Sequence, residues 1–211
     1  TPPIDGKLNR GKGGPGDAFY VTGNSHHNII ENNTILNTSH YGVNIQEGYN
    51  NIIRDNYFAN KWHAAVGLYS GHFKPVYENI VENNMIVDSG DEHLQNMCEG
   101  DIRGWSWERN NFTGLQIDAT ESIVRGNVFI NNGQTNMATF AGPAQNNRTY
   151  NNSYSMNYRS VYFWGEITDT YLFALSNNVY KNNVFYQDIE HAVYANSNGT
   201  MGKNAFQSND F

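Results

Sequence analysis

The sequence predicts an all-β fold, a parallel β-helix in which three short strands form each coil and about eight coils stack into one solenoid. The segment at residues 28–37 returns along nearly the whole chain, at steps of 17 to 31 residues. A period in this range, with β-forming residues around a turn residue, is typical of a solenoid. The repeated asparagines are Asn33, Asn56, Asn84, Asn110, Asn127, Asn152, Asn183 and Asn204. Two places after each stands an apolar residue: Ile35, Phe58, Ile86, Phe112, Phe129, Tyr154, Phe185 and Phe206.

Each repeat predicts two short strands and the bend between them. Within residues 29–36 a polar pair separates two extended runs, each long enough for one short strand. Asparagine suits the bend because it tolerates the left-handed conformation and bonds its own backbone. Stacked coils would bring these amides together at about 4.8 Å, so we expect a ladder of amide hydrogen bonds. Three places before the anchors stand Ile30, Ile53, Val81, Trp107, Val124, Thr149, Tyr180 and Met201, which predicts a second core column.

A third extended run follows a variable turn in most coils. These runs are residues 41–45, 65–69, 115–118, 160–164 and 192–195. Side chains alternate between the two faces of a strand, so the apolar positions of each run face inward. The alternation predicts one outward column of Asn44, Gly67, Gln116 and Tyr162 and a second of Gln46, Tyr69, Asp118 and Trp164.

The repeated N-x-I-x-x-N-x-[IF] pattern resembles the right-handed parallel β-helix repeat of the pectate-lyase-like superfamily and its carbohydrate-binding and sugar-hydrolysis relatives. The resemblance covers roughly residues 17–211 and implies a right-handed β-helix domain there. Residues 1–16 are expected to be irregular and to cover one end of the stack. The fold occurs in lyases, hydrolases, epimerases, tailspikes and export accessory proteins, so by itself it selects no reaction. The resemblance implies a secreted or periplasmic carbohydrate-active protein.

Composition limits the partners. The net charge of −7 argues against nucleic acid, which requires a basic surface, and favours a neutral polysaccharide or oligosaccharide over a polyanionic one. No run of eighteen apolar residues exists, so no membrane-spanning helix is predicted. The single Cys98 forbids an internal disulfide. The chain lacks an initiator methionine and an obvious terminal cap, and we expect a homo-oligomer or a longer parent chain.

The third coil is the first place to look for chemistry. Residues 88–108 concentrate acids, two tryptophans, a histidine and an arginine. Trp107 occupies the predicted core column, but the repeat does not explain Trp105 or the acids. If Glu99 faces outward there, it stands one coil from Asp118, and carboxylates in one column of adjacent coils lie about 5 Å apart. Retaining and inverting glycosidases use carboxylate pairs at about 5 Å and about 6.5–9.5 Å. We therefore expect Asp118 with Glu99 or Asp101 as the catalytic pair, supported by Arg103.

The expected groove combines polar groups with aromatic rings, which offer flat apolar surfaces to sugars. The predicted substrate-binding residues are Gln46, Tyr69, Trp105, Gln116, Tyr162 and Trp164. The histidines match no common metal-ligand spacing and are interpreted as surface or turn residues. No metal site is predicted and no cofactor is certain, although calcium stays possible for a lyase.

Two other classes of function remain open. Residues 41–47 resemble the Y-G-[FI]-D-P-H-[ED] segment of mannuronan C5-epimerases at Tyr41, Gly42 and Glu47, but Asn44 and Gln46 replace its catalytic Asp and His. A polysaccharide lyase would need a lysine base and an arginine. The non-enzyme alternative is a structural, adhesive or tailspike-type solenoid. Acids clustered in one groove favour an enzyme, and acids scattered around the perimeter favour a scaffold.

Overall fold

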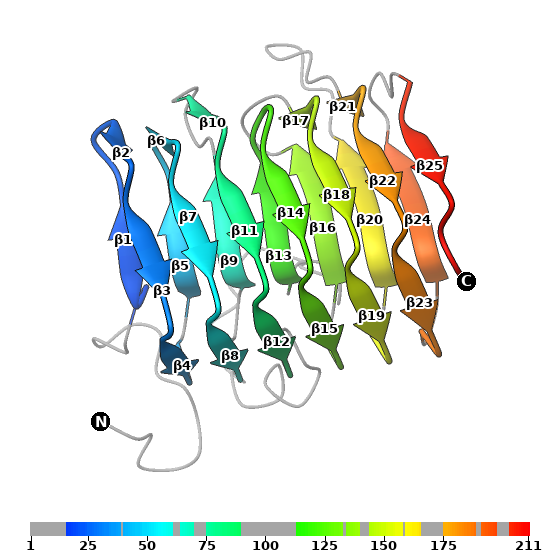
Figure 1. The fold of residues 1–211 in the computed structure, drawn as a ribbon, viewed down its shortest axis with the longest axis horizontal. Helices are drawn as coiled ribbons and strands as arrows, with labels where there is room; N and C mark the ends of the chain where they lie inside the picture. The colour runs from blue at the N-terminus through cyan, green and yellow to red at the C-terminus, as the bar shows by residue number, and fades with distance from the viewer. Residues whose placement is uncertain are drawn as a thin grey trace, which may run out of the picture.

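The computed structural model describes most of the chain as one solenoid of parallel strands (Figure 1). The described residues are 16–38, 40–60, 64–69, 75–89, 113–132, 134–139, 144–157, 159–165, 175–188, 191–197 and 203–211. Every pairing between the described strands is parallel, and no helix is assigned in these ranges. The predicted irregular segment 1–16 lies almost wholly outside them.

Three long sheets form the walls. Sheet I has seven strands: β1 (Phe19–Val21), β5 (Tyr41–Ile45), β9 (Ala64–Tyr69), β13 (Thr113–Asp118), β16 (Gln134–Thr139), β20 (Arg159–Gly165) and β24 (His191–Ser197). Sheet II also has seven: β3 (Ile29–Glu31), β7 (Ile52–Arg54), β11 (Ile80–Glu82), β14 (Ile123–Arg125), β18 (Arg148–Tyr150), β22 (Val179–Lys181) and β25 (Ala205–Gln207). Sheet III has six: β4 (Thr34–Leu36), β8 (Tyr57–Ala59), β12 (Met85–Val87), β15 (Val128–Ile130), β19 (Ser153–Ser155) and β23 (Val184–Tyr186).

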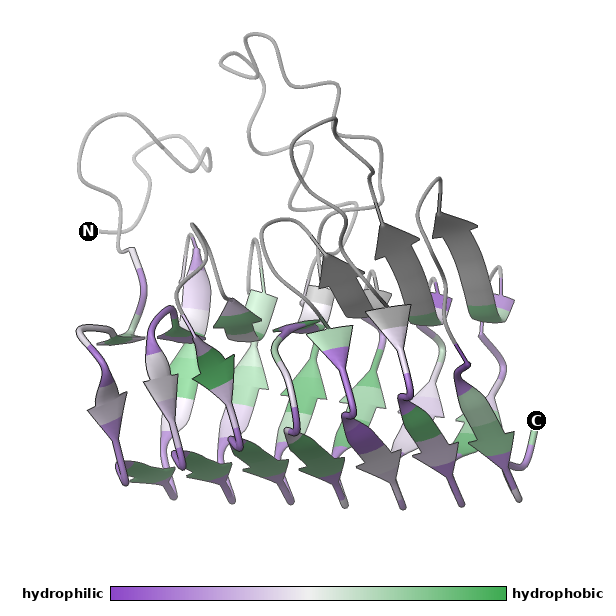
Figure 2. Cartoon of the chain, turned by 90° about the horizontal axis from the view of Figure 1, so that it is seen from above, coloured by the Kyte–Doolittle hydropathy of each residue, from purple (hydrophilic) through white to green (hydrophobic). Residues whose placement is uncertain are grey.

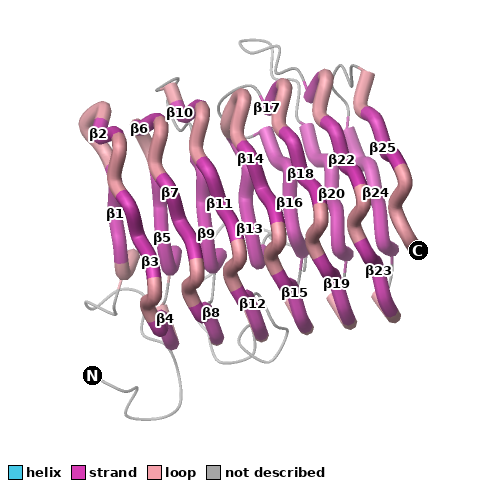
Figure 3. Tube along the Cα trace, in the orientation of Figure 1, coloured by secondary structure: helices cyan, strands magenta, loops and turns pink. Residues whose placement is uncertain are grey.

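Short strands continue the stack along the edge between sheets I and II. They are β2 (Ser25–His26), β6 (Gly48–Tyr49), β10 (Val76–Tyr77), β17 (Ala144–Gln145) and β21 (Leu175–Ser176). The strands β2, β6 and β10 form one group and β17 and β21 a second, and single bridges from Tyr77 to Thr120 and from Thr120 to Gln145 join these groups. The order β1, β5, β9 to β24 follows the chain from one end of the solenoid to the other, so each sheet adds one strand per coil (Figure 3).

Two consecutive residues make each corner. The first has a left-handed backbone, as at Asn32 and Asp55, and the second turns an asparagine inward, as at Asn33 and Asn56. The left-handed conformation is accessible to Asn and Asp because their short polar side chains bond locally. The predicted bend and the predicted ladder are therefore both present, but on adjacent residues.

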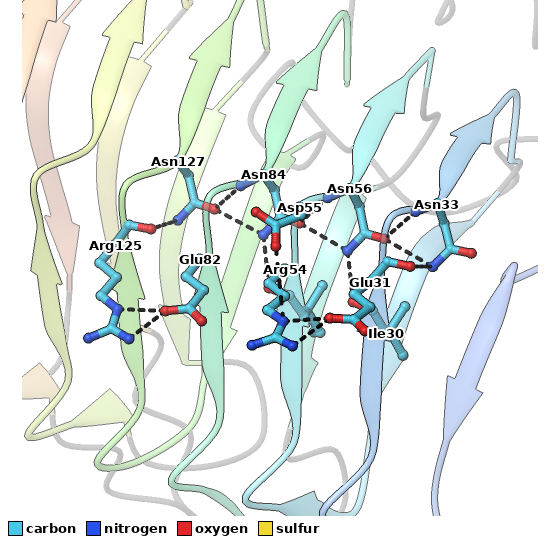
Figure 4. Close-up of polar contacts among 11 residues, drawn as sticks. Ile30, Glu31, Asn33, Arg54, Asp55, Asn56, Glu82, Asn84, Arg125 and Asn127 are labelled. Atoms are coloured by element: carbon cyan, nitrogen blue, oxygen red, sulfur yellow. Dashed lines mark hydrogen bonds and ion pairs between the residues drawn. The ribbon is translucent and has the colours of Figure 1, made fainter.

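Ladders of asparagine side chains connect neighbouring coils by hydrogen bonds. Asn84 shows the pattern: its Oδ1 accepts from the amide and Nδ2 of Asn56 at 3.0 Å, and its Nδ2 donates to Asn127 Oδ1 at 3.0 Å (Figure 4). The predicted ladder runs through Asn33, Asn56, Asn84, Asn127, Asn152, Asn183 and Asn209. A second ladder, five residues earlier, runs through Asn28, Asn51, Asn79, Ser122, Asn147, Asn178 and Asn204.

Two of the eight predicted anchors are wrong. Asn84 bonds directly to Asn127, so Asn110 is not a rung between them, and Asn204 belongs to the second ladder. The first predicted core column therefore passes directly from Ile86 to Phe129, which are paired. Phe112, Trp107 and Met201 themselves lie outside the described residues. Phe206 pairs with Tyr180 and so stands in the other core column.

Apolar side chains fill the interior in columns. The predicted column of Ile35, Phe58, Ile86, Phe129, Tyr154 and Phe185 is confirmed, and each of these side chains is buried. The rings of Phe129, Tyr154 and Phe185 stack at centroid distances of 4.9 and 4.8 Å, the spacing of the coils. Hydrophobic colour lies mainly on the strands and hydrophilic colour on the turns that join them (Figure 2).

Among the residues that the structure describes, none belongs to a helix long and apolar enough to span a membrane.

Candidate functional site

The outer face of sheet I holds polar side chains that are shielded from water. The predicted outward columns are in register: Asn44 pairs with Gly67 and Gly67 with Gln116, while Tyr69 pairs with Asp118. Asn44, Gln116 and Asp118 are only 1, 2 and 0% exposed. Buried polar groups cost free energy unless they find partners, so their contacts identify the site.

Tyr41 reaches this outer face because the strand departs from strict alternation. A Cβ on Gly42 would lie 2.7 Å from the ring of Phe58, so position 42 faces the interior. Val43, the next residue, is also buried in the core. Two successive inward positions leave Tyr41 on the outside, at the start of β5.

The Tyr41 ring crosses β9 to reach β13. It lies directly on Gly67, where an added Cβ would meet the ring at 2.4 Å. Its hydroxyl donates a hydrogen bond of 2.8 Å to Gln116 Oε1, two strands away. Glycine is required at position 67 because any side chain would displace the ring. Tyr41 thus joins three neighbouring coils on one face.

Asp17 anchors the N-terminal side of the cluster. Its Oδ1 contacts His40 Nδ1 at 2.6 Å and accepts from the Tyr41 amide at 3.0 Å, and its Oδ2 accepts from Asn44 Nδ2 at 2.9 Å. Burial raises the pKa of Asp17, but the hydrogen bonds from His40, Tyr41 and Asn44 outweigh burial and hold this pKa below its usual value. The His40 ring packs edge-on against Tyr41 at 4.4 Å and keeps 43% of its side chain exposed.

Asp118 marks the other end of the cluster, where β13 ends. Burial raises the pKa of Tyr41 well above its usual value, and the charges of Tyr69, Asp118 and Asp17 add to this effect. Burial and the charge of Asp118 likewise raise the pKa of half-buried Tyr69. Both tyrosine hydroxyls therefore stay protonated at neutral pH, and that of Tyr41 donates to Gln116.

The accessible rim of the cluster is formed by earlier coils. Tyr20, which is 53% exposed, donates a short hydrogen bond to Gln46 Oε1. The Gly23 amide donates to Glu47 Oε2 at 3.2 Å on the same edge. Rings, amides and hydroxyls at the rim, with carboxylates beneath, give a surface able to hydrogen-bond and stack on a polyhydroxylated ligand.

Comparison with known proteins agrees with this architecture. Residues 9–97 match the family described as right handed beta helix region. The chain is a right-handed parallel β-helix repeat protein. Comparison with curated proteins and with solved structures gives no match. The assignment of this β-helix protein therefore rests on the match over residues 9–97 and on the strand topology, and its reaction must be argued from its own residues.

The β-helix protein brings several predicted site residues together. Gln116 and Asp118 are buried on β13, Tyr69 lies in register with Asp118, and Gln46 stands one coil earlier. The backbones of Tyr162 and Trp164 lie on β20, paired with Asn136 and Ala138 of β16. Their side chains lie outside the description, as do the predicted residues Glu99, Asp101, Arg103 and Trp105.

The expected source of the carboxylate pair needs correction. Glu99 was expected on a sheet strand one coil from Asp118. In the β-helix protein the two neighbours of β13 are β9 and β16, so no strand of residues 90–112 lies beside it in sheet I. The expectation failed because Asn110 resembles a rung and suggested an extra coil. Pairing of Asp118 with Glu99 or Asp101 stays a prediction.

Sequence reasoning missed Asp17 and His40 as members of the cluster. The sequence predicts a surface or turn position for His40, yet its ring forms the closest contact of Asp17. The available signal was their separation of 23 residues, which equals the coil step from Asn33 to Asn56. The interior position of Gly42 had no counterpart in strict alternation, so the outward position of Tyr41 could not be anticipated.

In the described part of the chain, no group of three or more His, Cys, Asp or Glu side chains converges as a metal site. Both oxygens of Asp17 already accept hydrogen bonds. Calcium binding stays a prediction without a donor set among the described residues.

Proposed function

We propose that the protein binds a glycan on the outer face of sheet I and hydrolyses it, with Asp118 as one of two catalytic carboxylates. The binding surface covers β5, β9 and β13. The proposal includes a secreted or periplasmic location, where polymeric glycans occur, and a neutral glycan as substrate, because the net charge of −7 disfavours a polyanion.

The observation that carries the proposal is the position of Asp118. Its side chain is 0% exposed on the outside of the solenoid, although burial of a carboxylate is costly and the fold does not require one there. The equivalent positions in neighbouring coils hold Tyr69 and Ala138. Perturbed ionisable groups gathered in one place are characteristic of functional sites.

The chemistry assigned to the site follows from its protonation states. Tyr41 and Tyr69 remain protonated, so they can orient the Asp118 carboxylate or a sugar hydroxyl but cannot serve as bases at neutral pH. In the proposed mechanism Asp118 acts as nucleophile or base. Glu99 or Asp101 supplies the general acid, as the two-carboxylate mechanism requires.

Binding is assigned to the rim. Tyr20, Gln46 and Tyr69 offer rings and amide or hydroxyl groups, and His40 extends the surface past the start of β5. A glycan lying along the strand direction would contact His40 at one end and Tyr69 near the other. Binding energy from these remote contacts would position the scissile bond over Asp118.

The test is a screen of neutral and uronic polysaccharides with wild type, Asp118→Asn and the matched control Asp55→Asn. Asp55 is an exposed corner residue with a left-handed backbone that asparagine also adopts. We expect Asp118→Asn to lower kcat by at least about 100-fold with little change in glycan affinity, and the control to keep full activity. Full turnover by Asp118→Asn refutes the catalytic assignment.

A second candidate is elimination by a polysaccharide lyase, favoured by one observation. The Asp17 carboxylate holds the His40 imidazole at the start of β5, where 43% of the His40 side chain is exposed, and this provides a base at the edge of the binding surface. Elimination leaves an unsaturated sugar with new ultraviolet absorbance, whereas hydrolysis leaves a saturated reducing end. Binding without any product would support the scaffold alternative.

A further inference from the structure

The outer face of sheet II carries a column of alternating charges. Glu31, Arg54, Glu82 and Arg125 occupy the same outward position on β3, β7, β11 and β14. Within the chain they form two ion pairs: Arg54 Nη2 lies 2.6 Å from Glu31 Oε2, and Arg125 Nη2 lies 2.5 Å from Glu82 Oε2 (Figure 4). The side chains remain partly exposed, so their charges face the surroundings of the protein.

A column of isoleucines runs beside the charges. Ile29, Ile52, Ile80 and Ile123 pair in register two residues before each charged position. Ile29 is 53% exposed and the other three are partly exposed. Their apolar surface is therefore available for burial against a partner. Arg148 follows Ile123 and ends the apolar column. The two columns together form a four-strand patch, here called the ladder patch.

We infer that the ladder patch binds a second copy of this chain, with the two solenoid axes antiparallel. When the order Glu31, Arg54, Glu82, Arg125 is reversed, every position receives a side chain of the opposite charge. An antiparallel partner therefore places Arg125 opposite Glu31 and Glu82 opposite Arg54, with the same two contacts repeated by symmetry. Every cross-contact joins opposite charges.

The geometry also selects the symmetry axis. A two-fold axis parallel to the strands, passing between β7 and β11, reverses the coil order and keeps each column at its own height. The charged column then faces the partner's charged column, and isoleucine faces isoleucine. A two-fold axis along the solenoid would instead set charges against isoleucines. The first arrangement is the isologous contact expected of a symmetric dimer.

The neighbouring outer face of sheet III lacks such a pattern of charges. Its outward positions, including Tyr57, Met85, Val128 and Val184, carry no charged residue in strands β4, β8, β12, β15, β19 and β23. It offers apolar surface but nothing that specifies a register or an orientation. Charge complementarity is what fixes register and excludes wrong partners, and only the ladder patch supplies it among the described outer strands of sheets II and III.

The test uses two charge-reversed versions of the full chain. The first combines Glu82→Arg with Arg125→Glu, and the second combines Glu31→Arg with Arg54→Glu. Each keeps two opposite-charge pairs within the chain, but in a homodimer each makes like charges meet at every cross-contact. Sedimentation across a concentration series should show a dimer for wild type and dimerisation weaker by about 100-fold for either variant alone.

Mixing the two variants restores opposite charges at every cross-contact, so the mixture should dimerise like wild type. Each variant still contains the same like-charge neighbours at positions 54 and 82, so rescue cannot come from repaired folding. Thermal unfolding of each variant confirms that it is folded. Absence of rescue overturns the inference, as does a wild type that stays monomeric at the highest concentration reached.

A pair of apolar substitutions locates the interface. Ile80→Glu, at the centre of the ladder patch, should weaken dimerisation by at least about 100-fold, whereas Met85→Glu on sheet III should leave it unchanged. Met85 is 43% exposed and Ile80 is partly exposed, so the control introduces the same charge at an outward strand position of the neighbouring sheet, and thermal unfolding of both variants shows that each is folded. Dissociation by the Met85 variant alone would place the interface on sheet III and refute the assignment.

Discussion

Removal of one interior rung should cost far more than removal of a terminal rung. In Asn84→Ala, the amide of Asn56 and one hydrogen of its Nδ2 lose their acceptor, which is Asn84 Oδ1 at 3.0 Å in both cases. Asn56 is 2% exposed, so water does not replace the lost partner. An unsatisfied buried group costs about 1–3 kcal/mol, and two such donors predict a loss of about 3–4 kcal/mol.

The matched control is Asn33→Ala at the first rung. The Asn33 side chain donates to Asn56 Oδ1 and to the Glu31 carbonyl, and Asn56 Oδ1 keeps its bond from the Asn33 amide. Its truncation should therefore cost only about 1 kcal/mol. Urea unfolding followed by circular dichroism and by fluorescence measures both losses and tests whether the transitions coincide. Equal losses for the two variants would refute the account of the ladder.

Two further predictions concern single positions in the walls. Asp188 takes the place of an asparagine next to Asn157, and burial raises the pKa of its carboxyl group. Ionisation of Asp188 therefore opposes folding, so the free energy of unfolding falls as the pH rises from the ordinary carboxyl pKa through the raised pKa of the folded state. Asp188→Asn should remove that slope and add about 1 kcal/mol at neutral pH, by a new bond to the Tyr154 carbonyl; chemical unfolding at several pH values checks this, and an unchanged slope contradicts it. Gly67→Ala should cost about 1–3 kcal/mol because its Cβ meets the Tyr41 ring, and the loss should shrink when Tyr41→Ala is added; simple additivity in the double-mutant cycle would disprove the contact.

The fold could be predicted because its signal is local and repeated. Ile35, Phe58 and Ile86 each stand two places after an inward asparagine, and the strand pairing follows from stacking them. The same test could not reject Asn110, which has an apolar residue at the right offset. The stronger signal is the spacing of five residues between the two ladders, as in Asn28 with Asn33, which also assigns Asn204 to the earlier one.

The candidate site was only partly predictable for a related reason. Gln116, Tyr69 and Asp118 follow from alternation, which holds near the end of each sheet I strand. Alternation fails near the start of the strand, where Gly42 turns inward, so the path of Tyr41 across Gly67 depends on packing that no periodic rule contains. Burial on the outer face is also a property of the assembled molecule rather than of any one repeat.

The corner between sheets II and III has a consequence for how such a protein diversifies. Two residues separate the strands at this corner in every coil, from Glu31 to Thr34 through Lys181 to Val184. The passage from sheet III to sheet I instead varies from the short link between β15 and β16 to residues 88–112. Length changes on that side leave the stacking of the opposite walls untouched. New segments can therefore be grafted at the start of the sheet I strands, beside His40, without rebuilding the solenoid, which makes this edge the natural place to engineer altered ligand preference.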